Sequence, residues 1–207
     1  MKKDGYYWQY IPDGDEESLI KKINSLSKVA LFDLKGSLLE IADLCFYKNF
    51  KLLKATTFNT IPPVTMQYLV GGSAPEWTVI KLDGTREPIF ENNLQAGLTL
   101  NEETIIEYAR FVLGAVMSED GSLRLVEAVD EDTFTADPTP TQREEITRFI
   151  RPAKVKKTGD GFELDVIILY GANVYRADVS VLSDGFTEIK NEELLAEDMP
   201  IRPIFLE

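Results

Sequence analysis

Six Asp-Gly pairs divide this chain into short segments, and they constrain its fold more than any other sequence feature. They include six of the 13 glycines and occur at Asp4-Gly5, Asp13-Gly14, Asp83-Gly84, Asp120-Gly121, Asp160-Gly161 and Asp184-Gly185. Asp-Gly favours tight turns because both central positions of a type I′ turn need positive φ. Several pairs lie between runs of apolar and β-branched residues. The spacing therefore predicts β-hairpins and antiparallel sheets.

Apolar and polar residues alternate most clearly in the C-terminal part of the chain. One run covers residues 162–170 and a second covers 175–181, each with period two and one polar face. A third run covers 186–190, and an upstream run, 150–157, meets the first across Asp160-Gly161. Such alternation is typical of half-buried strands. We therefore expect four successive strands that form an antiparallel β-meander.

An amphipathic helix is predicted over residues 101–117. Asn101 is a suitable N-cap, and Ile105, Ala109 and Val112 fall on one helical face. The segment that follows, 122–129, alternates as a strand does. A helix next to an antiparallel sheet predicts an α+β fold in which the helix lies across the sheet.

The N-terminal half predicts a short helix and further short strands. Residues 15–26 have a helical apolar face, and the segments with strand character are 29–34, 50–58, 65–70, 77–82 and 85–90. Pro88 would confine the last of these to a sheet edge, because proline cannot donate to the ladder. Residues 37–46 fit a helix or a strand, and periodicity leaves both open.

Two units are expected, a mixed α+β unit at 1–100 and a helix-plus-sheet unit at 101–207, or else one continuous domain. The segment 130–145 contains two prolines, four threonines and six acidic residues, with little apolar content. That composition predicts an exposed loop.

The charge is large, negative and unevenly distributed. The chain has 22 basic and 35 acidic residues, a net charge of −13, and no histidine. Residues 1–100 hold 11 basic and 12 acidic groups, whereas residues 101–207 hold 11 and 23, a net charge of −12. This balance argues against nucleic-acid binding, which needs a field of Lys and Arg. An acidic half is suited to a cationic partner.

Common catalytic and cofactor-binding patterns are missing from the sequence. Without histidine, Ser-His-Asp and Cys-His catalysis are excluded. No phosphate-binding glycine motif occurs, and the acids around Asp13 and Asp15 lack the glycine and the closing glutamate of a Ca²⁺ loop. The single cysteine, Cys45, stands between Leu44 and Phe46 and is expected to be buried and inert. No cofactor and no metal site are predicted.

Targeting signals are not evident either. The basic start is not followed by an apolar segment, and no window approaches 18 apolar residues. We therefore expect a cytoplasmic protein with no membrane partner.

The most unusual local feature is an aromatic cluster formed by Tyr6, Tyr7, Trp8 and Tyr10. Aromatic side chains with polar tips are favoured at binding surfaces, so these four residues are the predicted binding site. The alternative, which we favour, is that the N-terminal segment docks as an edge strand and buries these residues for structural reasons.

Acidic residues supply two further candidates. Asp130, Glu131 and Asp132 are predicted as an acidic surface for a partner, and Glu163, Asp165 and Asp178 could meet across the meander. Carboxylates are the only plausible catalytic acids and bases in this chain.

These observations favour a non-catalytic binding or protein-interaction module. Its partner would be a protein or a small ligand, and a homo-oligomer joined through an exposed sheet or the aromatic N-terminus is compatible with the pattern. The alternative is a carboxylate-dependent hydrolase-type enzyme with a cleft site, with or without a divalent metal ion.

Overall fold

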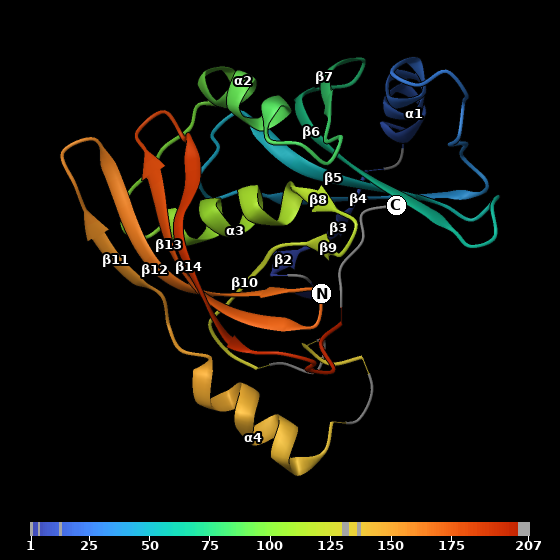
Figure 1. Ribbon diagram of the computed structural model, residues 1–207. Coiled ribbons are helices and arrows are strands. Elements are labelled where there is room, and N and C mark those ends of the chain that lie inside the picture. Colours follow the sequence, from blue (N-terminus) through green and yellow to red (C-terminus); the bar gives the residue numbers. More distant parts are fainter. Residues whose placement is uncertain (1, 4, 13, 130–132, 136–137, 203–207) are drawn as a thin grey trace. The chain divides into compact units, whose positions relative to one another are not determined.

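The computed structural model describes residues 2–3, 5–12, 14–129, 133–135 and 138–202, and these form two compact units (Figure 1). Unit 1 contains the described residues up to Asp83 together with Glu87–Thr99. Unit 2 contains Gly84–Arg86 and the described residues from Leu100 onward. The α+β fold predicted from the sequence is confirmed, because helices accompany an antiparallel sheet in each unit.

Unit 1 is built on a five-stranded antiparallel sheet in the order β3-β4-β5-β6-β7. Its strands are β3 (Gln9–Tyr10), β4 (Ser37–Asp43), β5 (Phe50–Thr57), β6 (Val64–Ser73) and β7 (Glu76–Lys81). A separate ribbon pairs β1 (Lys2–Lys3) with β2 (Tyr6–Tyr7). Of the helix and the strand that were both possible for residues 37–46, the structure has the strand, β4. The strands expected at 50–58, 65–70 and 77–82 are also present.

One face of the unit 1 sheet is covered by α1 (Glu16–Ser25), close to the helix predicted at 15–26. Its buried residues Leu19, Ile20 and Ile23 pack in one cluster with Leu53 and Tyr68 of the sheet. Apolar residues at helical spacing on α1 and at alternate positions of the strands therefore build the core of this unit.

The helix α2 (Glu87–Ala96) occupies the segment predicted as the strand 85–90, so that prediction is wrong. Pro88 is the second residue of α2, where its missing N–H has no intrahelical partner to lose. Two hydrogen bonds join α2 to an earlier segment of unit 1. The Tyr47 hydroxyl donates to Oδ1 of Asn93 on α2, and the Asn49 N–H donates to the carbonyl of Ala96 on α2 at 2.9 Å.

The strand predicted at 29–34 is also absent. In its place the side chain of Asn24, on α1, binds the passing backbone. Its Oδ1 accepts the N–H groups of Leu31 and Phe32 at 3.0 and 3.1 Å, and its Nδ2 donates to the Phe32 carbonyl at 2.8 Å. Because one amide side chain satisfies these backbone groups, the segment needs no neighbouring strand.

Unit 2 contains the predicted meander. Its strands are β10 (Arg124–Val126), β11 (Lys154–Lys157), β12 (Gly161–Tyr170), β13 (Asn173–Leu182) and β14 (Thr187–Ala196). The order is β10-β12-β13-β14, and β11 also pairs with β12, so β10 and β11 follow one another along the same edge of β12. A small hairpin joins β8 (Met117–Ser118) to β9 (Gly121–Ser122). Three Asp-Gly pairs, at 120–121, 160–161 and 184–185, join antiparallel strands as predicted.

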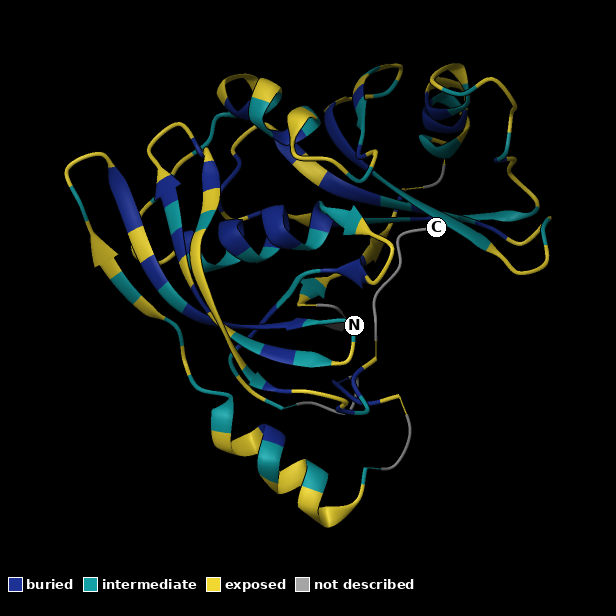
Figure 2. Cartoon of the chain, viewed as in Figure 1, coloured by how far each residue is buried: buried dark blue, intermediate teal, exposed yellow. Residues whose placement is uncertain are grey.

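The helix α3 (Ile105–Ala115) runs across the unit 2 sheet (Figure 1). Seven of its residues are buried, and dark-blue buried bands recur along α3 in Figure 2. The Tyr108 hydroxyl donates to the Gly185 carbonyl at 2.8 Å. The helix begins four residues later than predicted. Asn101 is not its N-cap; Asn101 Oδ1 accepts the N–H groups of Glu103 and Thr104 in a turn before the helix.

The helix α4 (Pro140–Phe149) overlaps the segment predicted as a loop, 130–145, so the prediction is wrong for residues 140–145. Thr139 caps it: the Thr139 hydroxyl accepts the Gln142 N–H at 3.3 Å, and Gln142 Oε1 accepts the Thr139 N–H at 3.0 Å. Only Ile146 of this helix is buried, in a cluster with Ile167, Leu169 and Val174. Most of α4 is coloured as exposed or intermediate in Figure 2. The helix thus covers part of one sheet face while most of its own surface stays exposed.

Candidate functional site

The structure separates the four aromatic residues predicted as a binding site. Trp8 is buried at 8% exposure, and Tyr6 is half-buried with its ring edge-on to Trp8, the ring centroids 5.8 Å apart. Tyr7 and Tyr10 are 68% and 72% exposed. Part of the aromatic segment is therefore docked on the protein, and part of it faces solvent.

Trp8 is joined to a charge pair on the unit 1 sheet. Lys54 Nζ lies 4.3 Å from the centroid of the Trp8 ring and 2.8 Å from Glu40 Oε2. Tyr10, Glu40 and Lys54 are register partners on β3, β4 and β5. The Lys54 and Glu40 side chains are only 13% and 20% exposed, so this pair anchors the N-terminal segment in a partly dry environment. Sequence reasoning missed both charged residues.

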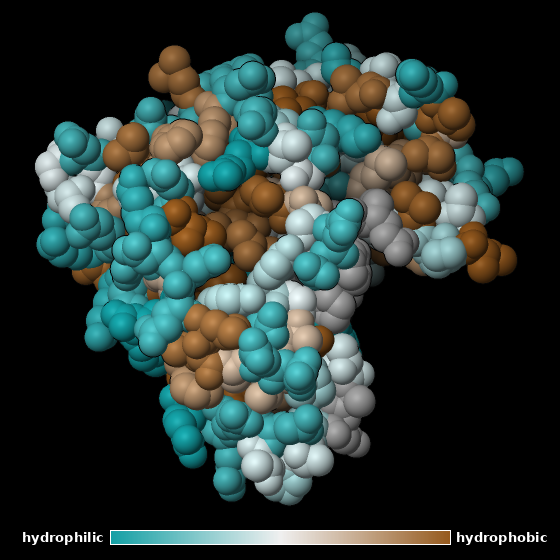
Figure 3. All heavy atoms as spheres, in the orientation of Figure 1, coloured by the Kyte–Doolittle hydropathy of each residue, from teal (hydrophilic) through white to brown (hydrophobic). Residues whose placement is uncertain are grey.

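A cluster of exposed apolar side chains lies on two loops at one end of unit 1. We call it the loop patch. The loop between α1 and β4 and the turn between β5 and β6 supply its members, which are Leu26 at 43% exposure, Val29 at 65%, Leu34 at 53%, Phe58 at 58% and Ile61 at 100%. Hydrophobic spheres gather over these loops at the right-hand edge of Figure 3. The sequence analysis did not single out these residues.

Hydrogen bonds hold the two loops of the patch together. The Phe58 N–H donates to the Gly36 carbonyl at 2.8 Å, and Asn59 Nδ2 donates to Asp33 Oδ2 at 2.6 Å. The other carboxylate oxygen of Asp33 accepts the N–H groups of Gly36 and Lys35 at 2.7 and 2.8 Å. These donors, above all the Gly36 and Lys35 amides and then Asn59, lower the pKa of Asp33. The patch is therefore presented by a fixed loop pair.

Two lysines border the loop patch. Lys28 adjoins Val29, Lys35 adjoins Leu34, and both are exposed. The carboxylate of Asp33 between them is already occupied by the three N–H donors described above. The surface therefore combines apolar side chains with a positive margin.

The acidic candidates Asp130, Glu131 and Asp132 lie outside the described residues. Of the other acidic candidates, Asp165 and Asp178 are register partners on β12 and β13, and Asp165 is the centre of an ion cluster. Asp165 binds Arg151 Nη2 at 2.6 Å and Arg176 Nε at 3.0 Å. Glu163 is paired separately with Lys156 at 2.9 Å.

The electrostatics of Asp165 are those of a structural carboxylate. Burial alone would raise its pKa, but the hydrogen bonds and charges of Arg176 and Arg151 outweigh burial and lower the pKa. A general acid near neutral pH needs the opposite shift, a raised pKa. The arrangement is suited to holding β12 and β13 together.

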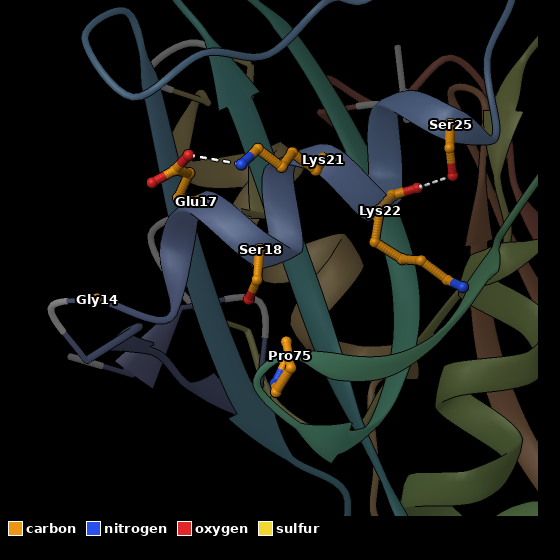
Figure 4. Close-up of a pocket in the computed structure, with 7 residues that line it drawn as sticks. All are labelled: Gly14, Glu17, Ser18, Lys21, Lys22, Ser25 and Pro75. Carbon is orange, nitrogen blue, oxygen red and sulfur yellow. Dashed lines mark hydrogen bonds and ion pairs between the residues drawn. The ribbon is translucent and has the colours of Figure 1, made fainter.

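A shallow pocket of about 490 Å³ lies beside α1 (Figure 4). Gly14, Pro75 and the α1 residues Glu17, Ser18, Lys21, Lys22 and Ser25 line it. Its two lysines point in different directions: Lys21 Nζ extends to Glu17, 2.6 Å away, and Lys22 extends to the opposite side (Figure 4). The cationic groups therefore do not converge on one ligand position.

Three further observations concern possible chemistry. Cys45 is exposed, so the prediction that it is buried is wrong; Leu44 and Phe46 beside it point into the core instead. Among the residues that the structure describes, no group of three or more Cys, Asp or Glu side chains could hold a metal ion. Within the same residues, no helix has the length and apolar character needed to cross a membrane.

Comparison with known proteins found no similarity: the chain matches no protein-family model, no curated protein and no solved structure.

Proposed function

We propose that this protein is a non-catalytic protein-interaction module and that its partner docks on the loop patch. The observation that carries the proposal is the exposure of five large apolar side chains on two loops that are hydrogen-bonded to each other. Scattered single exposed apolar residues are ordinary, whereas several that are gathered on two joined loops favour an interaction surface.

The chemistry of the patch defines the kind of partner. Phe58 and Ile61 would enter an apolar acceptor surface, because exposed aromatic and aliphatic anchors contribute most when they are fully desolvated. Lys28 and Lys35 would face an acidic rim on the partner, since complementary charge at the margin steers association. The fixed geometry of the loops reduces the entropy lost on docking.

Binding is favoured over the carboxylate-enzyme alternative by the state of Asp165. This carboxylate is neutralised by two arginines and its pKa is lowered, which removes it as a general acid at neutral pH. Among the described residues that line the pocket beside α1, Glu17 is the one carboxylate, and it is bound to Lys21.

Replacement of the two most protruding anchors on the β5–β6 turn tests the proposal. Proteins captured by the wild type, by a Phe58→Ser/Ile61→Ser variant and by a Leu94→Ser control are compared, and the partner is purified for measurement of Kd. Leu94 is a matched control because it is 95% exposed on α2 and is not part of the patch. We expect the double variant to bind about 30-fold or more weakly and the control to bind as the wild type does.

Other occupants of the patch give distinct results. If the wild type is a dimer by sedimentation equilibrium and the double variant is a monomer, the patch binds a second copy and the partner proposal is wrong. If the wild type binds anionic vesicles and the double variant does not, the occupant is a lipid surface and the proposal fails. Equal Kd values for wild type and double variant also contradict it.

A further inference from the structure

The sheet of unit 2 ends in two very different edges. One edge of β12 is covered by the short strands β10 and β11, and β11 exposes three lysines, Lys154, Lys156 and Lys157. The other edge of the sheet is β14, a strand of 10 residues. Among the described residues β14 pairs only with β13. Every second N–H and C=O of an edge strand points away from its neighbour, so β14 presents a row of backbone groups without a strand partner.

The middle of β14 is not covered by any described segment. Five consecutive residues from Lys190 to Leu194 are exposed, and Leu194 is 45% exposed. This strand is longer than the short edges with which soluble proteins ordinarily limit sheet extension.

The negative net charge on β14 disfavours pairing of this strand with the β14 strand of a second copy of the chain. The strand carries Glu188, Glu192 and Glu193 against the single base Lys190, a net charge of −2. Lys190 is bound within the strand to Glu188. Pairing β14 with the β14 of another copy would bring two negative strands together, and the half of the chain around them is already strongly acidic. Like charges across a strand pair are destabilising.

The same negative charge favours binding of an extended, positively charged segment of a partner protein. Arg176 approaches Glu193 only to 3.8 Å, and the exposed Glu192 forms no ion pair with the residues that the structure describes. At the first residue of β14 the chain itself provides a cationic donor: Arg86 Nη1 bonds to the Thr187 carbonyl at 2.9 Å. We propose that β14 is a second interaction edge, which takes an extended Lys- or Arg-rich protein segment as an added antiparallel or parallel strand. Backbone hydrogen bonds would give the affinity and the acidic side chains the selectivity.

A synthetic peptide tests this edge directly. The probe alternates Lys and Thr and is as long as β14. The control peptide has the same Lys-Thr sequence and charge but a methyl group on every backbone nitrogen, so it has no N–H to donate to a ladder. We expect the Lys-Thr peptide to bind, to weaken markedly when ionic strength rises to about 0.15 M, and to protect the outward-facing amides of β14 from hydrogen exchange. The N-methylated peptide should leave those amides unprotected.

Charge reversal identifies the side chains involved. A Glu192→Lys/Glu193→Lys variant should bind the Lys-Thr peptide about tenfold more weakly. A Glu102→Lys/Glu103→Lys variant changes the overall charge equally at two exposed residues before α3 and should bind as the wild type does. Both variants are checked for an unchanged circular dichroism spectrum.

The proposal is overturned by any of three results. These are failure of the Lys-Thr peptide to bind at low ionic strength, equal binding by the two charge-reversal variants, and binding without protection of β14 amides. The loop-patch variant Phe58→Ser/Ile61→Ser should bind this peptide normally, so failure of the edge and failure of the loop patch are separable.

Discussion

Lys54 and Lys51 lie on the same strand, and each forms an ion pair of nearly equal length with β4. Lys54 Nζ is 2.8 Å from Glu40, and Lys51 Nζ is 2.7 Å from Asp43. Their surroundings differ: the Lys54 and Glu40 side chains are 13% and 20% exposed, whereas those of Lys51 and Asp43 are 54% and 73% exposed. Solvent screens the second pair, so the two lysines should contribute very differently to stability.

Lys54→Met should lower the free energy of unfolding by about 1.5 kcal/mol, because it removes the cation over Trp8 and leaves Glu40 half-buried without its partner. Lys51→Met should change it by less than about 0.5 kcal/mol. Urea unfolding followed by tryptophan fluorescence measures both. Equal losses in the two variants would contradict the assignment of Lys54 as the anchor of the N-terminal segment.

Asp165 should make stability depend on pH in a defined direction. Its folded-state pKa lies below the ordinary value, so its stabilising effect is fully present above about pH 4 and is lost as pH falls through the folded-state pKa. Asp165→Asn should therefore cost about 1–3 kcal/mol at pH 7 and less in acid.

Urea unfolding of wild type and Asp165→Asn between neutral and acidic pH tests this dependence. Glu163→Gln is the control on the same strand, since its pair with Lys156 is well exposed, and it should cost less than about 0.5 kcal/mol. A difference between wild type and Asp165→Asn that stays constant down to the most acidic pH would refute the role given to the two arginines.

At the scale of elements, strands were predictable where alternation extends over many residues, as in β12 and β13. Two errors came from local signals that tertiary context outweighed. Pro88 argued for an edge strand, although the same residue is accepted in the first turn of a helix. Residues 29–34 look like a strand, but the Asn24 side chain, seven residues or more away in sequence, binds their backbone.

The candidate sites were less accessible to sequence reasoning than the fold. The contact of Trp8 with Lys54, and the pairing of Lys54 with Glu40, depend on the register of three strands, and that register is set by the assembled sheet. The loop patch depends on exposure, which a sequence does not show for isolated Leu, Phe or Ile residues. One signal was present and unused: Thr139 and Gln142 have the spacing of a capping box.

The capping box should decide whether α4 persists, because this helix buries only one residue. Thr139→Ala should destabilise the helix by about 1 kcal/mol and speed hydrogen exchange of its amides, with little effect on β12 or β13.

Thr147→Ala provides the control for the capping box. Thr147 lies within α4, where its hydroxyl bonds to the Arg143 carbonyl at 2.7 Å, and alanine is the better helix former. Exchange rates in α4 that respond equally to both substitutions would show that the cap is not the controlling contact.

For the whole molecule, tryptophan fluorescence reports unit 1 alone, whereas circular dichroism reports both units. Both tryptophans, Trp8 and Trp77, belong to unit 1. If each unit unfolds cooperatively by itself, Asp165→Asn in unit 2 should shift the transition seen by circular dichroism and leave the tryptophan transition in place. Lys54→Met should move the tryptophan transition. Coincident shifts in both signals for both variants would indicate one cooperative domain.

The return of the chain to unit 1 after Arg86 has a consequence for synthesis on the ribosome. The Thr99 N–H donates to the Phe46 carbonyl at 2.8 Å, and the Asn49 N–H donates to the Ala96 carbonyl. The last described residues of unit 1 therefore bind to its middle segment. The β3–β7 sheet of unit 1 can form on the nascent chain before residue 99 is synthesised. Unit 1 cannot make its last hydrogen bond to Phe46 until Thr99 has left the exit tunnel. The meander, whose strands follow one another from Lys154 to Ala196, can then form hairpin by hairpin as it emerges. The order of the elements along the chain therefore allows the first unit to be completed before the meander is synthesised.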